Sequence, residues 1–133
     1  MKSILFIFLL LFSGLSIYSQ SQKPTSKLQI YYFHATNRCP TCTDIENTTS
    51  DLLYSTYAAD VKSGVILFEA LDFEKPVNAD LSKKFQAYGS TLILMKPGNF
   101  ESKKDLTGMA FSTINNKEAY IEKLTEEIEA FLK

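Results

Sequence analysis

A nine-residue segment, residues 34–42, constrains the fold of this chain more than any other part of the sequence. It reads His-Ala-Thr-Asn-Arg-Cys-Pro-Thr-Cys and contains the single histidine, the single arginine and both cysteines of the protein. The run before it, residues 28–33, is aromatic and apolar on both faces, which is typical of a central strand. A buried strand, a short loop, a Cys-x-x-Cys pair and a helix-like run together predict a thiol–disulfide redox site.

The first 20 residues predict export. Met1 and Lys2 form a short positive start, residues 4–12 are wholly apolar, and residues 13–20 become smaller and more polar. This is the pattern of a secretory signal peptide, and the apolar run is too short to span a bilayer comfortably. We therefore expect a signal peptide over residues 1–20 and no stable membrane anchor after cleavage. The mature protein would be secreted, and periplasmic in a bacterium.

The mature chain is expected to form one domain, residues 21–133, with its own hydrophobic core. Removal of residues 1–20 takes away one lysine and no acid, so 13 basic and 15 acidic residues remain, a net charge of −2. The two signs are interspersed along the chain. This balance argues against nucleic acid as a partner and against a polybasic membrane-binding surface.

Alternating strands and helices predict an α/β fold. The expected order is β-α-β-α-β-β-α, with strands over residues 28–33, 65–72, 91–96 and 100–106 and helices over residues 43–57, 79–87 and 117–132. This alternation favours parallel strand pairing with right-handed crossovers, whereas the tight turn after the third strand makes the last two strands antiparallel. The second strand is too apolar for an exposed ribbon, and the charged last strand is expected at a sheet edge.

The final helix carries the clearest helical pattern of the chain. Asn115 and Asn116 precede it, and Asn115 with Glu118 three residues later resembles a capping box. Apolar residues recur at helical spacing and predict one buried stripe. That stripe is expected to consist of Ile121, Leu124, Ile128, Phe131 and Leu132.

The element order, with Cys-x-x-Cys after the first strand, resembles the thioredoxin superfamily over residues 27–132. Residues 31–34 (Tyr-Tyr-Phe-His), 38–42 (Arg-Cys-Pro-Thr-Cys) and 119–121 (Ala-Tyr-Ile) look like an exported bacterial group labelled nitrophenyl-compound nitroreductase subunit, ArsF type. The resemblance implies a thioredoxin-like three-layer fold with a mixed four-stranded sheet and flanking helices. The sequence has no Gly-x-Gly-x-x-Gly turn to hold a pyrophosphate, so we expect no flavin or nicotinamide cofactor.

Two positions differ from the superfamily pattern. Ser90 stands where a cis-proline is expected at the start of the third strand, and residues 31–33 lack the buried acid of thioredoxins proper. Both departures count against efficient disulfide reduction of the thioredoxin kind, and the loss of the proline leaves metal binding open. Tyr32 is expected in the core, and Tyr88 is expected to line the groove beside Ser90.

The two cysteines are expected to play different parts. Cys39 should lie exposed at the helix N-terminus, where unpaired N–H groups favour a thiolate, and Cys42 should lie one turn on and more buried. Arg38 adds a permanent positive charge beside Cys39, while Asp44 and Glu46 oppose it from further along the helix. These features predict that Cys39 is the nucleophile and Cys42 the resolving thiol.

Two further residues are expected to modulate this pair. Pro40 suits the first turn of a helix, and it removes one backbone donor from the loop between the cysteines. His34 has two open interpretations. It could shuttle a proton or modulate Cys39, or it could be a strand-end histidine that is hydrogen-bonded to backbone.

The leading hypothesis is a thiol–disulfide oxidoreductase without cofactor or resident metal. Its partners would be envelope-protein thiols or disulfides, together with a membrane electron donor or acceptor. The main alternative is a non-enzymatic module that holds copper or binds a protein through the same cysteines. A third hypothesis is an inert structural disulfide, although a two-residue loop gains little stability from closure.

Overall fold

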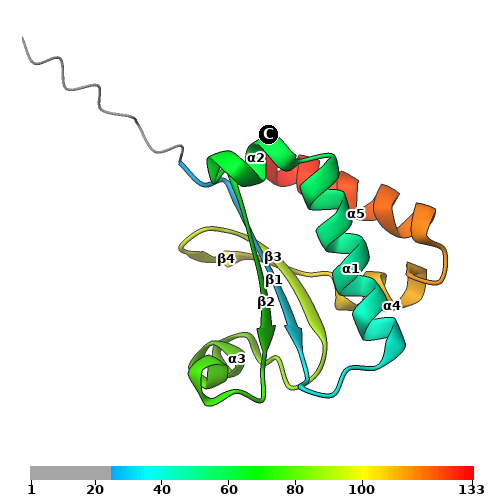
Figure 1. Ribbon diagram of the computed structural model, residues 1–133. Coiled ribbons are helices and arrows are strands. Elements are labelled where there is room, and N and C mark those ends of the chain that lie inside the picture. Colours follow the sequence, from blue (N-terminus) through cyan, green and yellow to red (C-terminus); the bar gives the residue numbers. More distant parts are fainter. Residues whose placement is uncertain (1–24) are drawn as a thin grey trace, which may run out of the picture.

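The computed structural model describes residues 25–133 (Figure 1). Its elements are β1 (Leu28–His34), α1 (Pro40–Ser55), α2 (Ala58–Ser63), β2 (Ile66–Asp72), the short 3-10 helix η1 (Pro76–Asn78), α3 (Ala79–Phe85), β3 (Thr91–Lys96), β4 (Asn99–Asp105), α4 (Thr107–Thr113) and α5 (Lys117–Leu132). None of the helices between residues 25 and 133 has the length and apolar character needed to cross a membrane. The signal peptide expected over residues 1–20 lies outside the described residues.

The four strands form one mixed sheet in the order β2-β1-β3-β4. β1 runs parallel to β2, with Leu28 opposite Ile66 and His34 opposite Asp72. β3 runs antiparallel to both β1 and β4. The α/β class, the four-stranded mixed sheet and the antiparallel last pair are therefore confirmed.

The expectation of parallel pairing was wrong for the third strand. The connection from β2 to β3 contains η1 and the seven-residue helix α3, and α3 lies across one end of the sheet (Figure 1). The chain therefore enters β3 from the end at which β1 and β2 finish, and β3 runs back along β1.

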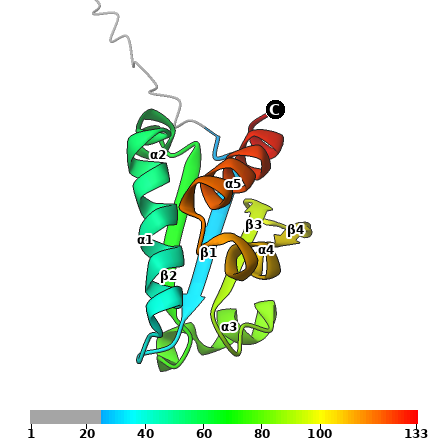
Figure 2. The same ribbon diagram turned by 90° about the vertical axis from the view of Figure 1, so that its right-hand side faces the viewer.

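β1 is one of the two inner strands, and both of its faces are covered. Tyr32 and its alternate neighbours on β1 pack in a cluster with residues of α1, α4 and α5. Phe33 packs on the other face with Phe85 of α3 and with Ile93 and Met95 of β3. Figure 2 shows α1 and α5 over one face of the sheet. Helices therefore pack against both faces of the sheet, α1, α4 and α5 on one face and α3 near one end of the other.

The two edge strands differ in how well they match the sequence. β4 is a charged edge strand, as expected, and its pairing with β3 is irregular between Leu94 and Lys96. β2 is also an edge strand, and the prediction that it is too apolar to be exposed was wrong. Only Ile66 of β2 is buried, and the Leu67 side chain is 36% exposed. Ile66 and Phe68 pack in the cluster with the helices, whereas Leu67 packs in neither cluster, so the apolar composition of β2 does not bury the whole strand.

Both long helices begin where their caps dictate. α1 begins three residues earlier than predicted, at Pro40, because Cys39 caps it. α5 has the predicted bounds, but its cap is Asn116, whose Oδ1 accepts a hydrogen bond from the Ala119 N–H at 3.2 Å. With Asn116 as cap, Glu118 is one position too early for a capping box. The proposed Asn115–Glu118 pair was therefore wrong.

The buried face of α5 is turned relative to the predicted stripe. Tyr120, Leu124 and Ile128 are buried, Phe131 and Leu132 are half-buried, and Ile121 is 37% exposed. The hydroxyl groups of Tyr120 and Thr49 of α1 lie 2.6 Å apart, within hydrogen-bond distance, which satisfies both groups inside the core. The sequence pattern also missed α4, a seven-residue helix between β4 and α5.

Candidate redox site

Cys39 is the N-cap residue of α1. Its backbone is extended, with φ −75° and ψ 155°, and its Sγ accepts a hydrogen bond from the Cys42 N–H at 3.1 Å. Pro40 occupies the first helical turn, where its missing N–H costs no helical hydrogen bond. The Thr43 N–H donates to the Cys39 carbonyl at 3.1 Å and continues the helix. The sulfur therefore lies at the positive end of a 16-residue helix.

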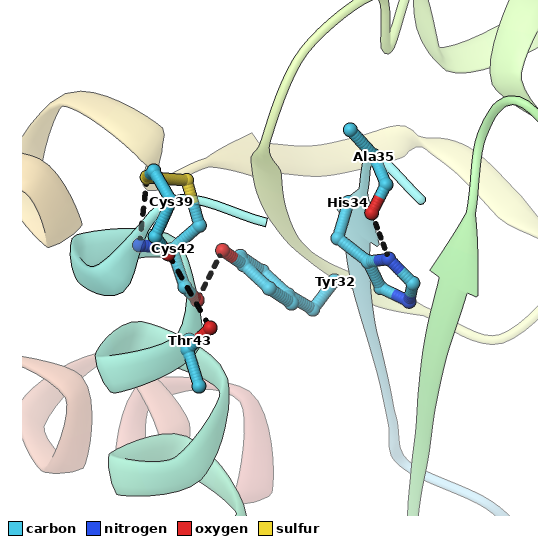
Figure 3. Close-up of a disulfide and its surroundings, with 6 residues drawn as sticks. All are labelled: Tyr32, His34, Ala35, Cys39, Cys42 and Thr43. Carbon is cyan, nitrogen blue, oxygen red and sulfur yellow. Dashed lines mark hydrogen bonds between the residues drawn. A yellow bond between two sulfur atoms is a disulfide. The ribbon is translucent and has the colours of Figure 1, made fainter. Parts of the chain in front are cut away.

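Cys39 and Cys42 form a disulfide within this first turn (Figure 3). Their Cα atoms are 5.1 Å apart. Cys39 is exposed and Cys42 is half-buried, as the sequence predicted. An incoming thiolate therefore reaches the Cys39 sulfur more readily than the Cys42 sulfur.

Tyr32 contacts residues 39–42, the cysteine-containing first turn of α1, which we call the redox turn. Its side chain rises from the middle of β1, and its hydroxyl donates a hydrogen bond to the Cys42 carbonyl at 2.7 Å (Figure 3). The residue is 1% exposed, so it belongs to the core, as predicted, but it also contacts the site. Burial raises the pKa of the Tyr32 phenol, and the side chain of Ser90 interacts with the phenol and opposes that rise. The alternation of β1 was the one sequence signal that places residue 32 on the helix side of the sheet.

Arg38, His34 and Glu46 form a chain of polar contacts beside the cysteines. One Arg38 nitrogen, Nη2, donates to Nε2 of His34 at 2.7 Å, and the other, Nη1, forms an ion pair with Glu46. A guanidinium can only donate, so Nε2 of His34 accepts and Nδ1 carries the proton. Nδ1 then donates to the Ala35 carbonyl at 2.9 Å. The backbone-bonded interpretation of His34 thus matches the geometry, and the ring also holds Arg38.

Glu46 lies closer to the site than the sequence suggested. It was expected to act weakly from further along the helix, but it pairs directly with Arg38. Both side chains of the pair remain partly exposed. The negative charge of Glu46 therefore partly cancels the electrostatic effect of Arg38 on the Cys39 sulfur.

Thr36 ties the loop before Cys39 to the end of β2. Its backbone N–H donates to a Glu74 carboxylate oxygen at 2.8 Å, and its hydroxyl donates to the Asp72 carboxylate at 2.7 Å. The hydrogen bond from Thr36 is the main reason that the pKa of Asp72 is lowered. Sequence reasoning missed these contacts, because residues 36 and 72 meet only through the parallel pairing of β1 and β2.

Ser90 lies directly before β3, half-buried, at the position where the superfamily resemblance places a proline. Between residues 25 and 133 every peptide bond is trans. Tyr88 in the same loop is 75% exposed. Ser90 lowers the pKa of the Tyr32 phenol and so lies near it, whereas the Tyr88 side chain is largely exposed to solvent.

In the part of the chain that the structure describes, Cys39 and Cys42 are not joined by the further ligands that a zinc site would need. Within residues 25–133 there is no group of three or more His, Cys, Asp and Glu side chains that could hold a metal ion. Figure 3 shows His34 separated from the two cysteines by Tyr32. Both ring nitrogens of His34 already have partners, namely Ala35 and Arg38.

No protein-family model and no curated protein matches the chain. Among solved structures, one described as "Structure of a malarial protein" is similar, with 25% sequence identity and a TM-score of 0.46. The match covers 74% of this chain and 97% of that chain. A similarity at this TM-score does not establish a common fold.

Proposed function

We propose that this protein is an exported thiol–disulfide oxidoreductase with a thioredoxin-like fold, acting on protein partners through Cys39 and Cys42. One observation carries the proposal. An exposed cysteine caps a long helix, accepts a backbone N–H at its sulfur, and is bonded to a half-buried cysteine one turn later. This is the environment in which a cysteine becomes a stable thiolate and a good leaving group.

The sheet topology supports the thioredoxin-like assignment. The strand order β2-β1-β3-β4, with β3 antiparallel to β1, is compatible with that fold, and the redox turn joins the central strand to α1. α2 and α4 are additions to the predicted order. They lie outside the β1–α1 junction that holds the cysteines.

The exchange would proceed in two balanced steps. In the reduced protein, Cys39 thiolate attacks one sulfur of a partner disulfide, a Cys39–partner bond forms, and the other partner sulfur leaves and takes up a proton. Cys42 then loses its proton and attacks Cys39, which releases the second partner sulfur as a thiol. Two electrons pass to the partner, and the Cys39–Cys42 disulfide remains. A dithiol of another protein restores the reduced form by the same steps.

Partners and location follow from the predicted signal peptide. An exported protein of this kind would act on thiols or disulfides of envelope proteins, in the periplasm of a bacterium. A membrane electron donor or acceptor would reset its cysteines. These assignments rest on residues 1–20 and on the chemistry of the pair.

A measurement of the reduction potential tests the proposal. The mature protein would be equilibrated in glutathione buffers, and the disulfide and dithiol forms would be quantified by thiol trapping. A potential near about −120 mV would make it an oxidant, and one near about −270 mV a reductant. A value well below about −300 mV, or no exchange at all, would overturn the proposal in favour of an inert disulfide.

A variant separates the enzyme from a copper-holding module. Cys42→Ser should accumulate a mixed disulfide between Cys39 and a partner, because the resolving thiol is absent. Cys39→Ser is the matched control and should trap nothing at that position. If wild-type protein instead binds copper(I) stoichiometrically, Cys42→Ser releases it, and no mixed disulfide forms, the metal-binding alternative replaces the proposal.

A further inference from the structure

Tyr32, in the middle of β1, touches the backbone of the resolving cysteine. Its hydroxyl donates to the Cys42 carbonyl at 2.7 Å, from a side chain that is almost fully buried. Burial holds the phenol in its neutral form by raising its pKa, so the group keeps the proton that it donates. The Cys42 carbonyl belongs to the first turn of α1, so this bond ties the redox turn to the central strand.

The same phenol lies near the loop that precedes β3, because Ser90, the last residue before β3, lowers the pKa of the phenol. The hydrogen bond of the Tyr32 hydroxyl joins two separate segments, β1 and the first turn of α1. The hydrogen bond from Tyr32 therefore restrains the Cys42 backbone independently of the disulfide.

We infer that Tyr32 is a positioning residue for Cys42, which holds the resolving cysteine in place when the disulfide is open and so favours the dithiol form. The inference rests on the proposed function for its biological meaning, but the coupling itself is a property of the fold. In the disulfide form, the covalent bond already restrains Cys42 within the first turn. In the dithiol and mixed-disulfide forms that restraint is gone, so the hydrogen bond from Tyr32 contributes more there.

The test is Tyr32→Phe, which removes the hydroxyl and keeps the ring in the core. We expect the equilibrium with glutathione to move several-fold, at most about fivefold, toward the disulfide, because one ordinary hydrogen bond corresponds to about that factor. Release of a small thiol from its mixed disulfide with Cys39 should slow by a similar factor. The rate at which the Cys39 thiolate first attacks should change much less.

Tyr31→Phe is the matched control. Tyr31 is the adjacent residue on β1, but it points to the opposite face and packs against Phe33 and Phe85. Its hydroxyl lies near Glu69, far from the first turn of α1, so loss of this hydroxyl should leave the glutathione equilibrium unchanged.

A second measurement separates this inference from the proposed function. Urea unfolding of wild type and Tyr32→Phe would be compared for the disulfide form and for the form reduced with excess dithiothreitol. A larger loss of stability in the reduced form supports the inference, even if wild type proves inert toward protein disulfides. Equal losses in both forms, no loss, or a larger loss in the disulfide form would overturn it and leave Tyr32 as an ordinary core residue.

Discussion

At the scale of single residues, Arg38 illustrates how a neighbour in sequence differs from a neighbour in space. It precedes Cys39 directly, yet its guanidinium is directed to His34 and Glu46. A guanidinium stays charged at every accessible pH, so its pairing with Glu46 sets how much of that charge acts on the sulfur. The reactivity of Cys39 should therefore depend on Glu46, although the two residues are not adjacent in the sequence.

Glu46→Gln tests this dependence. The substitution keeps a polar partner for Arg38 but removes the negative charge, so the Cys39 thiolate should be favoured. In the reduced protein, the pH at which alkylation of Cys39 by iodoacetamide reaches half its maximal rate should move downward. Asp51→Asn is the control, because residue 51 lies about 18 Å further along α1, beyond the range of the screened interaction. An unchanged or higher midpoint in Glu46→Gln would contradict the expectation.

Asp72 gives a pH dependence of a different origin. The Thr36 hydroxyl donates a hydrogen bond to the Asp72 carboxylate. In the folded protein, this bond lowers the pKa of Asp72 below its ordinary value of 3.8. A carboxyl group whose pKa is lower in the folded protein than in the unfolded chain stabilises the fold at pH values above the unfolded pKa. This stability is lost as the pH falls through the folded pKa.

The difference in stability between wild type and Asp72→Asn should therefore be present at pH 6 and should shrink below about pH 4. Urea unfolding of both proteins across this range provides the measurement. Asp80→Asn is a suitable comparison, because Asp80 is an exposed acid on α3. A difference that grows on acidification would show that the Thr36–Asp72 contact does not stabilise the charged form.

At the scale of secondary-structure elements, the start of α5 shows how a single cap selects a helix boundary. Two asparagines precede the helix, and both belong to residue types that favour caps. Asn116 caps the helix through its Oδ1, and Asn115 lies one residue before it. The extended backbone of Asn116 places its side chain over the N–H groups of the first turn.

Asn116→Ala should lower the free energy of unfolding by about 1 kcal/mol, because it leaves a helical N–H without its partner. Asn115→Ala should cost much less. Chemical denaturation of the two variants beside wild type decides between the two cap positions. A larger loss for Asn115→Ala would restore the capping box with Glu118 and contradict the structure.

At the scale of the whole molecule, the hydrophobic core is built without the cysteines. Two clusters of buried side chains, one on each face of the sheet, account for the packing, and neither contains Cys39 or Cys42. The disulfide lies at the rim of the larger cluster and closes a loop of only two residues. Its opening should therefore leave both faces of the sheet covered.

Reduction should leave a cooperatively folded protein. The free energies of unfolding of the disulfide and dithiol forms should lie within about 2 kcal/mol of each other, because the closed loop is short. Circular dichroism with urea, in the presence and absence of dithiothreitol, measures both values. Loss of the cooperative transition on reduction would mean that the disulfide is structural, and would remove support for the redox proposal.

Some features of this protein were determined by the sequence alone. The two-faced apolar run of β1, the bounds of α5 and the exposed–buried difference between Cys39 and Cys42 follow from residue types at local spacing. Such signals need only neighbours within a turn or a strand, so they survive without knowledge of the rest of the fold. The α/β class follows from the order of these local elements.

Other features were decided only by the tertiary structure. The direction of β3 depends on how far α3 carries the chain, and the exposure of β2 depends on which helices cover it. The contacts that define the site join residues that meet only after the sheet forms, such as the Tyr32 hydroxyl with Cys42 and the Thr36 hydroxyl with Asp72. Hydrogen bonds and packing act over a few ångströms in space, whatever the separation along the chain. Local patterns therefore predicted that the cysteines lie between a buried strand and a helix N-terminus. Only the tertiary structure determined which side chains surround them.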